Sequence, residues 1–280
     1  MGSASLRNPH ETGVLLLLHE FKQVELTDRA SALLDALKTR VVIADGAMGT
    51  MLQDRKPTLE DFEGHEGCNE VLNATRPDIV LDVHNAYFET GIDCVETNTF
   101  GANWSNLSDY GIDDRIEELA EAGARLARQS ADEFTAKDSK PRWVLGSMGP
   151  GTKLPSLGHT TYDFLKETFA RQAKGLIAGG SDAFMVETSQ DLLQTKAAIN
   201  GCKQAIVESG MRLPIFVEVT VETTGTMLMG SEIGAALTAL EPLGIDMIGL
   251  NCATGPAEMS EHLRQLSKHS QIPVMVMPNA

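Results

Sequence analysis

The sequence is short of paired cysteines, of basic residues and of long apolar runs, and each shortage excludes a class of protein. Its four cysteines are far apart, and no two of them form a CxxC pair. A chain of 280 residues can bury a core without disulfides, so we expect free thiols and a reducing, cytoplasmic location. The apolar run near the N-terminus, Val14 to Leu18, is too short for a signal peptide or a membrane-spanning helix.

Acidic residues outnumber basic ones: 39 acids stand against 23 lysines and arginines, which gives a formal net charge of −16. Such a chain cannot neutralise a phosphate backbone, so we expect no nucleic acid partner. A membrane surface, which is also anionic, is disfavoured for the same reason. We treat residues 1–27 as a leader of unknown role. No linker divides residues 28–280, which we interpret as one domain.

Short apolar segments alternate with longer helical patterns along this domain. Helical spacing of apolar residues is clear in Pro77–Gly91, for example, which begins with proline and ends with glycine. The alternation predicts an α/β domain with a parallel sheet. Seven segments have the near-continuous apolar character of parallel strands, and they begin at Val41, Asp93, Arg142, Asp182, Pro214, Asp246 and Pro273.

A parallel sheet of this kind is either doubly wound or closed into a barrel. No GxGxxG motif follows any of the predicted strands, so a dinucleotide-binding fold has no direct support. Polar residues end many of the strands, as the active-site face of a (β/α)8 TIM barrel requires. We therefore predict such a barrel. Because we count seven strands rather than eight, we expect it to be truncated after strand 7, with unpaired edges beside strands 1 and 7.

Carboxylates at the predicted strand ends are candidates for a binding site. Asp45, followed by Gly46, could face a cationic group such as an amine, or could be a turn or helix-cap residue. Glu187 follows four apolar residues, and a buried carboxylate is costly unless it is paired or bound to a ligand. The same reasoning applies to Glu96 and Glu218, although one of them could pair with a structural cation.

Cys252 follows Asn251 at the end of another predicted strand, just before a Thr-Gly-Pro helix start. It could be a small buried residue, a thiolate stabilised by the positive end of that helix, or a metal ligand. A zinc site needs three or four ligands, so one cysteine leaves the choice open. We expect the other three cysteines to be structural.

Several long motifs resemble a known family. They include "DGAMGTMLQ", "GCNEVLNATRPDIV", "VETNTFGANWSNL", "GSMGPGTKLPSLGHT" and "GIDMIGLNCATGPAEMSEHL". They resemble the homocysteine S-methyltransferases, and within that family the N-terminal homocysteine-binding modules of cobalamin-dependent methionine synthases. The resemblance runs from about Val41 to Ala280 and implies a (β/α)8 barrel.

The resemblance also implies a zinc site at the mouth of the barrel. Members of the family hold zinc through three cysteines, which leaves a fourth position open for the homocysteine sulfur. Cys252 matches the first of these cysteines. The other two form an adjacent pair in the family, and we expect them beyond Ala280.

Homocysteine itself is the substrate that the resemblance implies. Its amino-acid end would be held by Asp45 and Gly46, by Thr97 and by Glu187, while Asn251 would support the site. The bound thiolate would accept a methyl group from methylcobalamin, originally from 5-methyltetrahydrofolate, to give methionine.

The partners implied for this reaction are cobalamin- and folate-binding domains of a longer enzyme. None of those domains is present in this chain, so we expect the chain alone to be inactive. One alternative is a stand-alone methyltransferase that uses betaine or S-methylmethionine. Another is a non-catalytic fragment.

Overall fold

A computed structural model of the chain describes residue 17 and residues 19–279. Most of the apolar run at Val14–Leu18 therefore lies outside the described residues. Where the N-terminal segment is described, it packs against the domain: Phe21 is buried, and Leu26 forms a parallel backbone bridge with Arg212. In the described part of the chain, no helix is long and apolar enough to cross a membrane.

A single parallel sheet organises the domain. Its six strands occur in the order in which they appear along the chain, and each is hydrogen-bonded to the next. The sheet is curled into a half-barrel of the TIM-barrel type, as the predicted α/β class requires. The strands are β1 (Cys94–Glu96), β2 (Trp143–Met148), β3 (Ala183–Ser189), β4 (Ile215–Val219), β5 (Met247–Asn251) and β6 (Val274–Met277).

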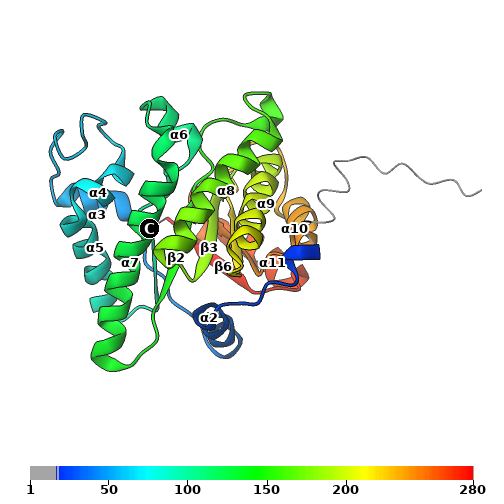
Figure 1. The fold of residues 1–280 in the computed structure, drawn as a ribbon. Helices are drawn as coiled ribbons and strands as arrows, with labels where there is room; N and C mark the ends of the chain where they lie inside the picture. The colour runs from blue at the N-terminus through cyan, green and yellow to red at the C-terminus, as the bar shows by residue number, and fades with distance from the viewer. Residues whose placement is uncertain (1–16, 18, 280) are drawn as a thin grey trace, which may run out of the picture.

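Helices alternate with the strands and cover the outer face of the sheet. In Figure 1, α7, α8 and α9 lie side by side in front of the sheet, and α2 lies below it. The main helices are α2 (Asp28–Thr39), α3 (Met48–Asp54), α4 (Leu72–Thr75), α5 (Pro77–Glu89), α6 (Trp104–Asp109), α7 (Ile116–Asp138), α8 (Tyr162–Gly179), α9 (Leu192–Ser209), α10 (Ile233–Leu240) and α11 (Pro256–His269).

Local sequence determines where α8 begins, where it ends and how closely it packs. The side chain of Thr161 accepts a hydrogen bond from the backbone of Phe164, and Gly180 ends the helix with a φ of 94°. Gly175 and Gly179 face α7: a Cβ on either would lie 2.4 Å from a backbone oxygen of α7. Glycine at these positions therefore allows the two helices to touch.

Aspartates at the beginning of alternate strands stabilise the end of the sheet at which the strands begin. The carboxylate of Asp93 accepts the N–H of Ile43, that of Asp182 accepts the N–H of Val144, and that of Asp246 accepts the N–H of Ile215. Each bond satisfies a backbone donor of the preceding strand segment that the ladder leaves unpaired. The polar residues at this end of the sheet are thus structural.

The segment predicted as the first strand, from Val41, is not a strand of the sheet, so the predicted seven strands become six in the described residues. Its one bridge joins Ala44 to Cys94 in parallel. The segment lies at the edge of the sheet, and Val41 and Ile43 are 82% and 55% exposed. Beyond this bridge, the segment and β1 do not form a continuous ladder.

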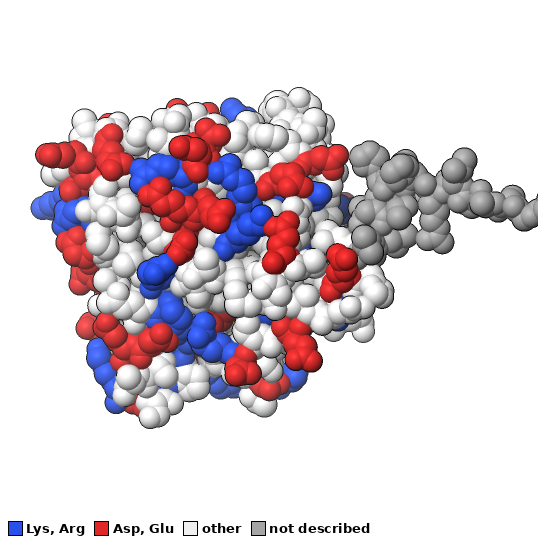
Figure 2. All heavy atoms as spheres, viewed as in Figure 1, with Lys and Arg blue, Asp and Glu red and all other residues white. Residues whose placement is uncertain are grey.

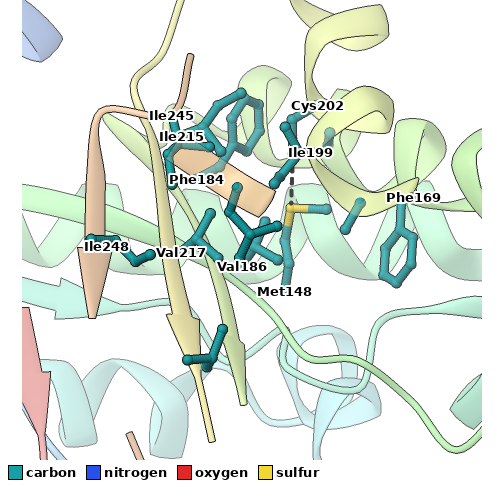
Figure 3. Packing of buried hydrophobic residues seen from close by; sticks show 14 of the residues in the cluster. Met148, Phe169, Phe184, Val186, Ile199, Cys202, Ile215, Val217, Ile245 and Ile248 are labelled. Carbon is teal, nitrogen blue, oxygen red and sulfur yellow. Dashed lines mark hydrogen bonds between the residues drawn. The ribbon is translucent and has the colours of Figure 1, made fainter. Parts of the chain in front are cut away.

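The outer face of the sheet packs against the helices to form the main core. Figure 3 shows Phe184, Val186 and Val217 of the strands meeting side chains of the helices, among them Ile199 and Phe169. These residues are all at most 3% exposed. Burial of this apolar surface is the largest favourable contribution to folding.

The inner face of the sheet has an apolar layer and a polar layer, because alternate residues of a strand point to the same face. The apolar layer lies near the beginning of the strands and is closed by Leu33 of α2. A step of two residues along β1 to β4, and of four residues along β5, leads from the apolar layer to the polar layer. The apolar layer contains Cys94, Leu145, Met185, Phe216 and Met247, and the polar layer contains Glu96, Ser147, Glu187, Glu218 and Asn251.

One face of the molecule carries charged side chains of both signs. Figure 2 shows the face formed by α7 and α8, on which lysine and arginine side chains are interspersed with aspartate and glutamate. Pairs such as Lys174 with Glu208 and Arg115 with Glu118 account for part of this mixture. Exposed pairs of this kind contribute little stability each.

Candidate active site at the carboxyl ends of the strands

One cavity of about 1400 Å3 occupies the inside of the half-barrel. Its floor is the apolar layer, and its rim is formed by the carboxyl ends of the strands. All six residues predicted for the site line this cavity, namely Asp45, Gly46, Thr97, Glu187, Asn251 and Cys252. The structure therefore brings the six residues to one cavity, and the function of each residue stays a prediction.

Asp45 is held by the backbone of the neighbouring strand. The N–H of Glu96 donates to both carboxylate oxygens of Asp45, at 2.9 and 3.0 Å. The residue preceding α3 is Ala47, and no side chain caps that helix. The helix-cap interpretation of Asp45 is therefore wrong.

The hydroxyl of Thr97 is engaged within the protein. It accepts a hydrogen bond from the N–H of Ser147 at 2.9 Å and lies 2.6 Å from the hydroxyl of Thr99. These bonds link the end of β1 to β2. Thr97 lines the cavity, but its hydroxyl is already hydrogen-bonded within the protein. Its side chain therefore contributes to the wall between Asp45 and Glu187.

Glu187 ends the buried part of β3 and is 7% exposed. The hydroxyl of Ser147 donates to one of its oxygens at 2.5 Å, and the amide of Asn251 donates to the other at 3.3 Å. Burial raises the pKa of the Glu187 carboxyl to about 7, and the bond from Ser147 opposes that rise. Near neutral pH this carboxyl is therefore poised between its two protonation states.

Carboxylates accumulate in the polar layer without a cation among them. Burial raises the pKa of Asp45, Glu96 and Glu218 well above the ordinary range, and nearby Glu187 raises it further in each case. Among the described residues, none of these four carboxylates forms an ion pair with a lysine, arginine or histidine. A cluster of acids with like charge and no counterion favours a cationic ligand.

Glu218 is the most isolated member of this cluster. It is fully buried, and neither of its oxygens has a hydrogen-bond partner in the described structure. The expectation that one of the glutamates pairs with a structural cation is wrong for Glu218. Burial without a partner disfavours the charged form and raises the pKa of the Glu218 carboxyl well above its ordinary range.

Cys252 is the accessible thiol of the chain. All four cysteines are free; Cys68, Cys94 and Cys202 are buried, whereas Cys252 is partly exposed and lines the cavity. Burial raises the pKa of the Cys252 thiol, and a hydrogen bond from Thr188 opposes the rise. The interpretation of Cys252 as a residue buried among aliphatic neighbours is therefore excluded.

Two residues of the site were missed in the sequence. Ser147 lies in a glycine-rich stretch of the sequence, and its hydroxyl donates to Glu187. Thr188 directly follows Glu187, which is the more obvious candidate in the sequence, yet Thr188 contacts both Asn251 and Cys252. The signal for Ser147 was its position two residues after apolar Leu145, on the inner face of β2.

The described residues do not form a complete metal site. They include no group of three or more histidine, cysteine, aspartate or glutamate residues that could hold a metal ion. A tetrahedral zinc site takes three or four protein ligands, and two cysteines line the cavity, Cys94 in the buried floor and Cys252 at the rim, so the rim has a single thiol. Cys252 has the right chemistry for one zinc ligand, but the described donor set does not fit zinc by itself.

A parallel half-barrel with carboxylates, an amide and a thiol at its C-terminal rim defines a TIM-barrel type protein whose site lies where such folds carry out chemistry. The family model described as homocysteine S-methyltransferase matches residues 42–280. The chain belongs to the homocysteine S-methyltransferase family.

Curated relatives and solved structures agree with this assignment. The chain is 63% identical over 248 residues to methionine synthase of Mycobacterium leprae and to that of Mycobacterium tuberculosis. That match covers 89% of this chain but only 20% and 21% of those proteins. The crystal structure of the Escherichia coli homocysteine methyltransferase MmuM in its metallated form is also similar, with a TM-score of 0.74 at 20% identity over 90% of this chain and 88% of that one. At that identity the likeness shows the fold.

Proposed function

We propose that this chain is the homocysteine-binding domain of a methionine synthase. The cavity supports this proposal because it brings an acidic cluster and a thiol to one rim. Homocysteine has the complementary groups, an ammonium at one end and a sulfur at the other. The relatives at 63% identity are methionine synthases, so a stand-alone enzyme that uses betaine or S-methylmethionine is not favoured.

The ammonium group of homocysteine would lie beside Asp45 and Glu187. A cation at this position stabilises the ionised form of both carboxylates and thereby offsets the repulsion between them. Gly46 leaves the backbone accessible from the cavity, and Thr97 forms the wall between the two acids. Asn251 orients Glu187 through its amide rather than touching the ammonium.

The sulfur of homocysteine would lie toward Cys252. We propose that Cys252 supplies one ligand of a zinc ion and that two further cysteines, expected beyond Ala280, supply the rest. Zinc, when bound, would lower the pKa of a coordinated thiol and so make it a nucleophile at neutral pH. We also propose that strands beyond β6 complete an eight-stranded barrel around this site.

The methyl group would come from methylcobalamin, held by other domains of a longer enzyme, and originally from 5-methyltetrahydrofolate. The match to only a fifth of each mycobacterial relative supports the presence of such domains in the whole protein. A reducing compartment such as the cytoplasm suits four free cysteines.

A comparison of two ligands tests the amino-acid end of the site. L-Homocysteine and 4-mercaptobutyrate differ in the α-amino group, and binding of each to the purified chain can be followed by NMR in the presence of EDTA. We expect homocysteine to bind at least about tenfold more tightly, because a charge-assisted hydrogen bond is worth about 1.5–3 kcal/mol. The advantage should disappear in Asp45→Asn. Equal binding of the two ligands to the wild-type chain would refute the proposed orientation.

A further inference from the structure

Glu187, the carboxylate near the end of β3, is held by one donor on each of its oxygens. The hydroxyl of Ser147 in β2 donates to one oxygen at 2.5 Å, and the amide of Asn251 in β5 donates to the other at 3.3 Å. The N–H of Thr188 donates to the side-chain oxygen of Asn251 at 2.9 Å, so the NH2 group of Asn251 faces Glu187. The bond from Ser147 is much the shorter of the two, and it is therefore the stronger constraint on the carboxylate.

Ser147 is itself fixed on both sides of its backbone. Its N–H donates to the hydroxyl oxygen of Thr97 at 2.9 Å, and its C=O accepts the hydroxyl of Thr99 at 2.7 Å. All three residues are at most 2% exposed. A side chain that is buried on such a backbone has few conformations, so the Ser147 hydroxyl is a rigid donor.

The two bonds leave part of the Glu187 carboxylate available to a ligand. A carboxylate has about four lone-pair positions, and Ser147 and Asn251 occupy two of them. Glu187 lines the cavity, as Asp45 does. Because a hydrogen bond depends on direction as well as distance, a cation in the cavity meets Glu187 in the orientation that Ser147 imposes.

We propose that Ser147 is a positioning residue, which orients Glu187 so that the cavity selects thiols that carry a primary ammonium group. The inference rests on the proposed function, since it concerns the carboxylate that would bind the ammonium of homocysteine. It deals with the amino-acid end of the ligand and requires no metal ion.

The test compares L-homocysteine with 4-mercaptobutyrate, which lacks the ammonium group. Binding of each to the purified chain is followed by NMR at pH 7.5 with EDTA, and wild type should prefer homocysteine at least about tenfold. Ser147→Ala removes only the hydroxyl. It should reduce this preference at least about fivefold, because the freed carboxylate forms a weaker charge-assisted hydrogen bond with the ligand, while 4-mercaptobutyrate binds within about twofold of wild type. A general loss of shape would weaken both ligands alike.

Two variants serve as controls. Ser147→Thr keeps the hydroxyl, and its additional methyl group has room because Ser147 lines the cavity, so its preference should stay within about threefold of wild type. Ser105→Ala is the matched control, since Ser105 is also a buried serine. Its hydroxyl is bonded to the backbone and side chain of Thr152 rather than to Glu187, so the preference should not change.

A second measurement asks whether Ser147 acts through Glu187. In Glu187→Gln, the ionised carboxylate that Ser147 would orient is gone. Adding Ser147→Ala to this variant should therefore change the remaining preference by less than about twofold. An effect as large as the one in the wild-type background would overturn the proposal.

Three other results would also contradict it: an undiminished preference in Ser147→Ala, an equal loss in Ser105→Ala, or a loss in Ser147→Thr as large as that in Ser147→Ala. If Ser147→Ala does not fold, Ser147→Cys replaces it, because a thiol fills similar space but is a weaker donor. Failure of the proposed function is distinguishable, since wild type itself would then bind the two ligands equally.

Discussion

Replacing Glu187 by glutamine should make the protein more stable at alkaline pH and less stable at acid pH. The pKa of Glu187 is raised from an ordinary value of 4.5 to about 7 by burial. The folded chain therefore holds this proton more tightly than the unfolded chain does. The stability that results is fully present below pH 4.5 and is lost as the pH rises to about 7.

The size of the effect follows from the two pKa values. At 1.36 kcal/mol for each pKa unit, wild type loses about 3 kcal/mol of unfolding free energy across this range. Glutamine does not titrate and avoids the loss. It can still accept the hydrogen bond from Ser147, but its NH2 group cannot accept the bond from Asn251, which costs about 1 kcal/mol.

We therefore expect Glu187→Gln to be about 2 kcal/mol more stable than wild type at pH 8 and about 1 kcal/mol less stable at pH 4.5. For a domain of this size, the gain at pH 8 corresponds to a rise of about 4–8 °C in melting temperature. Thermal unfolding from pH 4.5 to pH 8, followed by circular dichroism, measures the pH at which the stability of Glu187→Gln equals that of wild type.

Glu89→Gln, at the exposed end of α5, is the matched control and should follow wild type at every pH. If the difference between Glu187→Gln and wild type were the same at pH 4.5 and pH 8, the assignment of a raised pKa to Glu187 would be refuted. A stabilised variant that also loses homocysteine binding would show that the acidic cluster is retained for function at a cost in stability.

Two further predictions concern the metal and the packing of the last strands. The 280-residue chain should bind essentially no zinc, whereas a longer form with the cysteines expected beyond Ala280 should bind about one ion per chain. Elemental analysis measures the zinc content of both forms. Equal zinc in the two would contradict the assigned ligand set. Gly249→Ala should lower the unfolding free energy by about 1–3 kcal/mol, because its Cβ would lie 2.5 Å from the backbone oxygen of Met275 in β6. Gly234→Ala in α10 meets only the flexible end of Gln265 and should be neutral in the same urea titration, so a matching loss in both would rule out a specific clash at β5.

Much of the architecture could be predicted from local patterns. Continuous apolar segments and helical stripes indicate parallel strands and covering helices, and polar residues mark the ends of five of the predicted strands. The prediction of a strand from Val41 was wrong because apolar character does not reveal backbone pairing. Its residues are as apolar as those of the other strands, but the segment forms only an isolated bridge, between Ala44 and Cys94.

Which residues face the cavity was determined in part by periodicity. Glu187 and Asn251 were recognisable because a polar side chain at the end of an apolar strand is costly to bury unless it has a hydrogen-bond partner or a ligand. Ser147 and Thr188 were not, since serine and threonine are ordinary in turns. Their roles depend on hydrogen bonds to residues 40 and 63 positions away along the chain.

The sequence by itself determined the class of fold, the family and the set of side chains that converge at the rim, because these depend on residue type, spacing and local motifs. Tertiary structure decided how those side chains are used. It paired the Asp45 carboxylate with a backbone N–H, left Glu218 without a hydrogen-bond partner in the described residues, and placed the Thr188 hydroxyl 3.7 Å from the Cys252 sulfur. Burial and hydrogen bonding set the protonation of such groups, and both arise only when distant segments pack together.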